Sequence, residues 1–349
     1  MVWQPNMRMN HYAFKKTKNT EIIRVFQRQG RVSSTFSNMT TGFPKEVIKM
    51  NMGMWNLRIV EYLNPCFGGL RSDGKILVGH EACMHEYKLN EDEWIHIKAK
   101  PRASYDGCSK GCMINDLALI CGGGLQNKVK VLQVRKMAPF VAALKSKMKS
   151  LEDKLISITE RKNQNCSTRN TYLYDICPTT MPLVVHYGHT IIATGTNCVM
   201  LLGGVLNSQV SNRVFQGELT ENRKDVTWTE LKSMETPRYF HVSFKMQNAI
   251  YVVGGLTENN RGISGCERYD IKQNVWLSFK HSLKFPLFRA SVVVSADESF
   301  AIITGGKRGG EYRTVENKDI IIFTKQEGFQ HQTKNSKNSR MDHISIRLQ

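Results

Sequence analysis

The sequence predicts an all-β protein built from a repeated unit, and three observations support this prediction. The longer apolar runs are short, rich in valine and isoleucine, and bounded by glycine, as at 250–253 and 301–304. Runs of this kind are typical of β-strands. Apolar residues make up 41% of the 349 positions, which is enough to bury a substantial core. A glycine pair also recurs along the chain at a constant spacing.

Each glycine pair closes an apolar run. The clearest pairs are Gly203–Gly204, Gly254–Gly255 and Gly305–Gly306, and 51 residues separate Gly204 from Gly255 and Gly255 from Gly306. An earlier copy is Gly122–Gly123, and Gly79–His80 is a degraded one. A constant period of this length indicates a repeat architecture in which each repeat is one small structural unit.

Other residues recur in a constant order between the glycine pairs. After Gly254–Gly255 the chain carries Tyr269-Asp270, then Trp276, then Arg289 before the next apolar run. The preceding unit has Trp228 and Pro237-Arg238 in the corresponding places. This order resembles the kelch repeat, over roughly residues 67–345. The resemblance implies a kelch-type β-propeller, in which four-stranded blades stand around a channel and leave few exposed edges.

We expect six blades, with five as the alternative, in a propeller over residues 51–348. A tyrosine and a tryptophan in each blade can fill the wedge against its neighbour. The strand 343–348 is expected to pair with N-terminal sequence and close the ring, and the sixth blade can use residues 20–62. Residues 1–50 form a basic N-terminal segment, either partly disordered or a degenerate blade strand.

The net charge of +19 lies mostly in three segments. Residues 1–50 carry nine Lys/Arg against two Asp/Glu, residues 126–171 carry eleven against three, and residues 325–349 carry five against two. The remaining chain is nearly neutral. Basic arms can meet acidic partners or nucleic acid, while the plainer interpretation is a set of solvated segments.

A helical insertion is predicted at 137–162, because 80 residues separate Gly124 from Gly204. Pro139 suits a first helical turn. Apolar residues at Val141, Leu144, Met148, Leu151, Leu155 and Ile158 then follow alternating steps of three and four. The stripe 141–158 can pack on the propeller, dock a partner or mediate self-association. Its expected departure after Gly124 would place it beside the channel mouth, as a lid or docking arm.

Several classes of protein are not favoured by the sequence. The first ten residues lack the apolar core of a secretory signal, and no run approaches the roughly 18 apolar residues that cross a bilayer. Nine cysteines at irregular spacing suit reduced thiols, so a cytoplasmic or nuclear location is expected. Cys108 and Cys112 lie near His80 and His85, but the usual zinc-ligand spacing is missing. We expect no metal, no cofactor and no catalytic residue.

The resemblance implies a non-catalytic protein–protein interaction scaffold or adaptor, including a substrate-recognition module. Kelch propellers mostly bind proteins through loops at one end of the channel. The candidate partner-binding residues in such loops are Asn259, Asn260, Arg261, Lys307, Arg308 and Arg313. We expect the partner to be a protein. An acidic protein is one option, because arginine in a rigid loop can form forked hydrogen bonds to acidic side chains. The alternatives are a nucleic-acid-associated protein that uses its basic arms and a metal-dependent kelch-fold enzyme.

Overall fold

The computed structural model describes residues 45–52, 55–63, 66–80, 83–88, 93–97, 108–123, 128–136, 170–176, 180–310, 313–332 and 343–348. These residues form antiparallel β-sheets. Over the described ranges, no helix is long and apolar enough to cross a membrane. The predicted helical insertion at 137–162 and most of the basic N-terminal segment lie outside the described residues, so the helix and its apolar stripe stay predictions.

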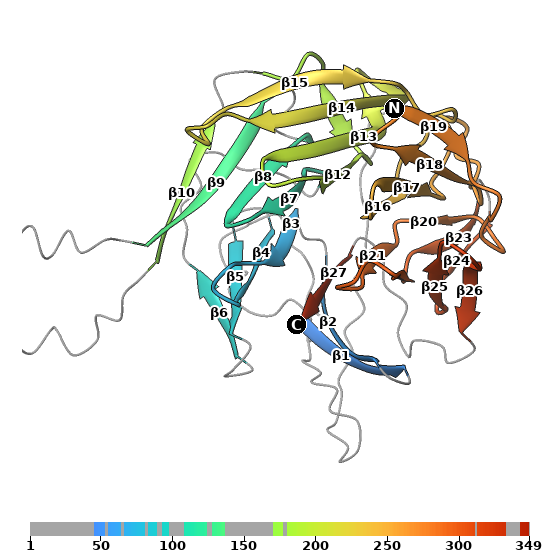
Figure 1. Ribbon diagram of the computed structural model, residues 1–349, viewed down its shortest axis with the longest axis horizontal. Coiled ribbons are helices and arrows are strands. Elements are labelled where there is room, and N and C mark those ends of the chain that lie inside the picture. Colours follow the sequence, from blue (N-terminus) through green and yellow to red (C-terminus); the bar gives the residue numbers. More distant parts are fainter. Residues whose placement is uncertain are drawn as a thin grey trace, which may run out of the picture.

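Six sheets stand around a central axis, and we number them as blades 1 to 6 along the chain (Figure 1). The innermost strand of each blade contacts the innermost strands of its two neighbours. Around the ring these strands are β27, β3, β7, β12, β16 and β21 (Figure 1). The ring of six blades confirms the propeller prediction.

The strand bounds of the first three blades are as follows. Blade 1 consists of β27 (His343–Leu348), β2 (Trp55–Leu63) and β1 (Lys45–Met52). Blade 2 consists of β3 (Phe67–Leu70), β4 (Ile76–His80), β5 (Cys83–Lys88) and β6 (Glu93–Ile97). Blade 3 consists of β7 (Lys110–Ile114), β8 (Leu117–Cys121), β9 (Val129–Lys136) and β10 (Asn170–Ile176).

Blades 5 and 6 have four strands each, and blade 4 has a fifth strand. Blade 4 consists of β11 (Val185–Tyr187), β12 (Thr190–Ala193), β13 (Cys198–Leu206), β14 (Gln209–Leu219) and β15 (Val226–Leu231). Blade 5 consists of β16 (Val242–Met246), β17 (Ala249–Val253), β18 (Cys266–Asp270) and β19 (Val275–Ser278). Blade 6 consists of β21 (Ser291–Val294), β22 (Phe300–Thr304), β25 (Ile320–Thr324) and β26 (Gly328–Gln332). A separate small sheet consists of β20 (Leu287–Phe288), β23 (Lys307–Gly310) and β24 (Arg313–Glu316).

Blade 1 joins the two ends of the described chain. Its strand β27 pairs with β2 in antiparallel register, from Arg58 opposite Leu348 to Leu63 opposite His343. The C-terminal strand therefore closes the ring on N-terminal sequence, as predicted. Blade 1 therefore joins the two ends of the described chain into one closed ring.

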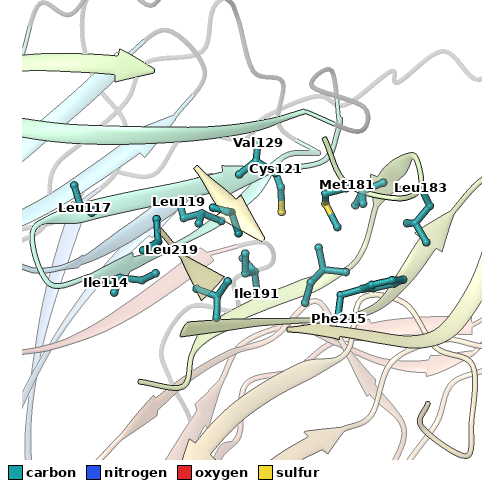
Figure 2. Packing of buried hydrophobic residues seen from close by; sticks show 14 of the residues in the cluster. Ile114, Leu117, Leu119, Cys121, Val129, Met181, Leu183, Ile191, Phe215 and Leu219 are labelled. Carbon is teal, nitrogen blue, oxygen red and sulfur yellow. The ribbon is translucent and has the colours of Figure 1, made fainter. Parts of the chain in front are cut away.

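The core lies in the wedges between blades. The largest cluster joins side chains of blade 3, including Leu119 and Cys121, to side chains of blade 4, including Ile191 and Phe215 (Figure 2). Blades 5 and 6 share a second cluster around Tyr251, whose ring lies 4.9 Å from that of Phe323 between centroids. Each blade is therefore stabilised mainly by its neighbours.

The recurrent tryptophans lie on the outer strands of blades 4 and 5, β15 and β19. Trp276 of β19 lies opposite Tyr269 of β18, with ring centroids 5.1 Å apart, and its Nε1 donates to the Lys232 carbonyl at 2.7 Å. Trp228 lies opposite Gly217 and packs against the cluster of blades 3 and 4. Lys232 follows the last strand of blade 4, so Trp276 connects that blade to blade 5. These positions confirm the alignment of the repeats.

The insertion leaves the propeller at a different point from the one predicted after Gly124. Residues 129–136 form β9, whose Lys136 is paired with Asn170 of β10. Because β8 and β9 are antiparallel, with Cys121 opposite Val129, Lys136 lies at the end of the blade away from the glycine pair. The expected departure after Gly124 is therefore wrong, and the lid or docking arm stays a prediction because residues 137–162 lie outside the described residues. The alternating apolar residues of 129–136 complete the blade before the insertion begins.

Candidate functional site

The glycine pairs lie together at one end of the propeller, which we call the glycine-end face. Its described parts are residues 185–189, 203–208, 236–241, 254–265, 285–290 and 305–319. The backbone at this face has an unusual conformation at the glycine pairs. Gly203, Gly204, Gly254, Gly255 and Gly306 all have positive φ, a conformation that glycine adopts without steric cost.

The two glycines of a pair make room for different neighbours. A Cβ on Gly203 would lie 2.7 Å from the Arg238 carbonyl, in the segment that enters the next blade. A Cβ on Gly204 would lie 2.5 Å from the His189 amide nitrogen, in the segment that enters its own blade. The Gly204 amide also donates to the Arg238 carbonyl at 2.9 Å. The pair therefore allows three backbone segments to meet where blades crowd the axis.

The segment entering each inner strand has the same conformation in blades 4, 5 and 6. The residue two positions before the strand is Gly188, Phe240 or Arg289, with φ of 70°, 53° and 57°. The Phe240 amide donates to the Gly188 carbonyl at 2.8 Å, and the Arg289 amide donates to the Phe240 carbonyl at 2.9 Å. A continuous chain of hydrogen bonds thus links three blades around the channel mouth.

Aromatic side chains cover this chain of hydrogen bonds, and we call them, with Arg289, the aromatic rim. Its members are Tyr187, Tyr239, Phe240, Phe288 and Arg289. The ring centroids of Tyr239 and Phe240 lie 4.9 Å apart, and the Arg289 guanidinium lies 4.0 Å from the Phe240 ring centroid. Tyr187 is 39% exposed, although most large apolar or aromatic side chains are buried. The rim side chains therefore pack against one another, and the rim is open to solvent on one side.

A cavity of about 160 Å³ lies in the channel beneath the rim. Inner strands of blades 3, 4, 5 and 6 contribute to its lining, and no acidic residue belongs to that lining in the described part of the chain. Ser243 Oγ donates to Thr190 Oγ1 at 2.7 Å, and Thr190 Oγ1 lies 2.8 Å from His241 Nε2. Burial, with Arg238 and His189 nearby, lowers the pKa of His241 to about 3. Burial and the charge of Lys110 likewise lower the pKa of His189 to about 3.

These histidines are neutral at physiological pH, which limits what the channel can do chemically. A base with a pKa near 3 accepts protons poorly at neutral pH, so the Thr190–His241 pair is poorly suited to general base catalysis. The positions of the two histidines indicate a structural role. The His189 ring lies over Gly122 of blade 3, and the His241 ring lies over Gly203 of blade 4. Both rings fill the space that the first glycine of a pair leaves open.

A buried ion pair anchors the segment that enters blade 5. The Arg238 guanidinium pairs with the Glu267 carboxylate and donates to the Gly254 carbonyl at 3.0 Å. Glu267 also accepts from the amides of Glu235 at 2.7 Å and Thr236 at 3.1 Å. Arg238 is 1% exposed and Glu267 is 5% exposed. The pair holds residues 235–238 against β18 and thereby positions the rim residues that follow.

The six predicted partner-binding residues all lie on the glycine-end face, in two neighbouring groups. Asn259, Asn260 and Arg261 are exposed in the turn after β17. The Tyr239 hydroxyl donates to Asn260 Oδ1, which connects this turn to the aromatic rim. The turn also touches the second group, because a Cβ on Gly262 would lie 2.0 Å from the Gly309 carbonyl oxygen.

The second group lies on β23 and β24. Lys307 and Arg308 belong to β23, and Arg313 is exposed at the start of β24. The Arg308 side chain is engaged within the chain, pairing with Asp319 at 2.7 Å and donating to Asn317 Oδ1 at 2.8 Å. Its guanidinium also lies 3.9 Å from the Phe285 ring centroid. Arg308 therefore stabilises the small sheet, and the partner-binding role predicted for it stays a prediction.

Sequence reasoning missed the exposed members of the aromatic rim, chiefly Tyr187, Phe240 and Arg289. The feature that could have identified them is their position in the repeat: each lies two or three residues before an inner strand, at matching places in successive repeats. A zinc site at Cys108 and Cys112 gains no support from the described residues, among which no group of three or more His, Cys, Asp or Glu side chains could hold a metal.

Comparisons with known proteins agree with this architecture. A family model described as Kelch motif matches residues 237–279, which run from the segment entering blade 5 past the end of β19. Kelch-like protein 41a of Danio rerio is 32% identical over 140 residues, 40% of this chain and 21% of that protein. Kelch-like protein 13 of Homo sapiens is 32% identical over 149 residues, 41% of this chain and 22% of that protein. The matched region thus spans about a fifth of the length of these relatives.

A solved structure entitled "Structure of YjhT" resembles the whole ring. The TM-score is 0.58 with 10% sequence identity, and the match covers 81% of this chain and 87% of that chain. At this identity the likeness concerns the fold alone. The repeated glycine pairs, the six-bladed ring and the matched motif agree: this chain folds as a six-bladed β-propeller and carries a kelch motif at residues 237–279.

Proposed function

We propose that this chain is a non-catalytic protein-interaction module whose partner binds the glycine-end face. The observation that carries the proposal is the aromatic rim, where Tyr187, Phe240 and Arg289 pack against one another and remain partly exposed. Tyrosine and arginine are enriched among the residues that dominate binding energy at protein interfaces. Side chains that are already ordered lose little conformational entropy on binding.

The charge of the face supports an acidic partner. Arg261, Arg313 and Lys318 are exposed there, next to the partly exposed Lys307 and Arg289. Exposed acidic residues in the same described ranges are fewer, namely Glu258 and Glu316. Complementary charge steers a partner toward the face and fixes its orientation more than it adds affinity. Acidic segments of a protein fit this surface. The similarity of this chain to kelch-like proteins favours a protein as the partner.

The same features argue against an enzyme. The channel brings a threonine hydroxyl next to a histidine, but that histidine has a pKa of about 3 and no carboxylate among its described contacts. Cys66, Cys108, Cys112, Cys121, Cys198 and Cys266 are free thiols, which supports the proposed cytoplasmic or nuclear location. The self-association proposed for 141–158 concerns residues outside those that the structure describes.

The test is affinity purification from cell extract with the full chain as bait. A Tyr187→Ala/Arg289→Ala double variant is expected to lose the partner, because it removes the exposed ring and the charge of the rim. The matched control is Lys224→Ala/Lys272→Ala, which removes exposed charge from turns at the opposite end of the blades. Equal recovery by the rim variant and the wild type would contradict the proposal.

A second comparison separates protein binding from the nucleic-acid alternative. Binding driven by phosphate contacts falls steeply with salt, whereas binding through the aromatic rim changes much less. We expect the partner to remain bound after nuclease treatment and at moderate salt. Loss of all bound material on nuclease treatment, with unchanged recovery by the rim variant, would favour the nucleic-acid alternative.

A further inference from the structure

The small sheet on the glycine-end face ends in an uncovered strand. Its order is β20–β23–β24, so β24 pairs with β23 on one side only. All four residues of β24 are exposed, and Val315 is 62% exposed, the largest fraction among the exposed large hydrophobic side chains. An exposed sheet edge offers backbone groups on which another strand can pair.

The register shows which backbone groups point outward. Arg308 lies opposite Val315 and Gly310 opposite Arg313, and the Asn317 amide donates to the Gly306 carbonyl at 2.9 Å. Hydrogen-bonded pairs alternate along an antiparallel ladder. Val315 and Arg313 therefore direct their amides and carbonyls toward β23. Thr314 and Glu316 direct theirs outward, where no described residue receives them.

The strand is held in place before any partner arrives. Asn317, which is fully buried, donates through Nδ2 to the Gly305 carbonyl at 2.8 Å and accepts from Arg308 Nε at 2.8 Å. The neighbouring turn packs against the carbonyl of Gly309 at Gly262, with no room for a Cβ between them. An edge that is already ordered loses little conformational entropy when a further strand is added.

Charge decides which kind of strand fits. Residues 307–318 contain four basic and two acidic residues, and within the described chain Lys307, Arg313 and Lys318 form no ion pair. Two copies of this edge would bring these like charges together, which disfavours pairing between copies of the chain. An incoming strand rich in aspartate or glutamate would neutralise them.

We propose that β24 binds an extended acidic segment of a partner protein by strand addition, with Thr314 and Glu316 supplying the backbone hydrogen bonds. This mode combines main-chain hydrogen bonds for affinity with side-chain contacts for specificity. It deepens the protein-binding function proposed above and rests on it. The exposed Val315 side chain provides the apolar contact of the added strand.

The experiment selects displayed random nonapeptides on the intact protein and measures affinities of the selected peptides by fluorescence anisotropy. We expect the selected peptides to be acidic and free of proline at alternate positions. Thr314→Pro is expected to weaken binding by about tenfold or more, because proline removes the outward amide and its ring blocks the added strand. Thr314→Ala keeps the amide and is the matched control, with affinity expected to stay within about twofold of wild type.

Each remaining outcome decides the proposal. The absence of any selected binder, or equal affinity of Thr314→Pro and wild type, would overturn it. Should Thr314→Pro fail to fold, hydrogen exchange on the wild-type protein replaces it: the amides of Thr314 and Glu316 must gain protection when the peptide binds. A peptide or protein that is lost with Tyr187→Ala but retained with Thr314→Pro leaves the proposed function standing and refutes strand addition.

Discussion

Lowering the pH from 7 to 5 should destabilise the propeller through His189 and His241. Both side chains are buried, at 2% and 4% exposure, and each has a pKa of about 3 in the folded chain, against the ordinary histidine value of 6.5. Between these pKa values the unfolded chain binds a proton at each histidine and the folded chain does not. The unfolded state therefore gains protons as the pH falls, and the free energy of unfolding decreases.

The expected size follows from the two pKa values. For one histidine, the proton uptake of the unfolded chain between pH 7 and pH 5 amounts to about 2 kcal/mol. Two such groups lower the free energy of unfolding by about 4 kcal/mol, a large part of the stability of an ordinary domain. The window ends at pH 5 because carboxylates with lowered pKa, such as those of Asp270 and Asp297, begin to protonate at lower pH.

The assay is urea unfolding at pH 7, 6 and 5, followed by tryptophan fluorescence. His189→Gln and His241→Gln should each remove about half of the pH dependence, whatever they do to stability at pH 7. His186→Gln is the control, because His186 lies on the edge strand β11 and contacts Ser208 at 3.3 Å instead of the channel. A wild-type protein whose stability changes by less than about 1 kcal/mol over this window would refute the assignment of two buried neutral histidines.

Three further changes test the architecture by thermal or urea unfolding. Gly255→Ala should cost about 3 kcal/mol or more, because its φ is 98° and the new Cβ would lie 2.9 Å from two neighbours; a loss below about 1 kcal/mol would contradict the crowding. Trp276→Ala should cost about 2–4 kcal/mol through the lost wedge contact and the bond to Lys232, with Trp276→Phe recovering part of it; unchanged melting would place the ring outside the wedge. Arg238→Met should cost about 3–5 kcal/mol, since it leaves the buried Glu267 carboxylate unpaired, and the double change with Glu267→Leu should cost less than Arg238→Met alone.

The fold could be predicted because its geometry requires a particular residue type at single positions. The crowding at Gly204 and Gly255 excludes a Cβ, so the requirement appears in the sequence at a constant period. The wedge between blades needs a large ring, which Trp276 and Trp228 supply in order. Blade 1 was harder to align, because its strands β1 and β2 carry no glycine pair and its inner strand comes from the other end of the chain.

The candidate site was less accessible to sequence reasoning because it is assembled from several blades. Tyr187, Phe240 and Arg289 are about 50 residues apart and become neighbours only through the hydrogen bonds that link successive blades. The engagement of Arg308 depends on Asp319, which reaches it only when β23 and β24 pair. The insertion was placed at the wrong end because residues 129–136 were not recognised as a strand.

One steric requirement connects the fold to the proposed interaction face. The positive φ of the glycine pairs lets the segments entering blades 4, 5 and 6 approach the axis closely. That approach positions Gly188, Phe240 and Arg289 for their chain of hydrogen bonds and stacks the rim side chains above it. Replacing Gly255 should therefore disturb more than stability, because the Tyr239 and His241 backbone that it contacts carries Phe240 between them. A Gly255→Ala variant that still folds should bind partners more weakly than its stability alone explains, whereas Trp276→Phe, which changes a wedge far from the rim, should not.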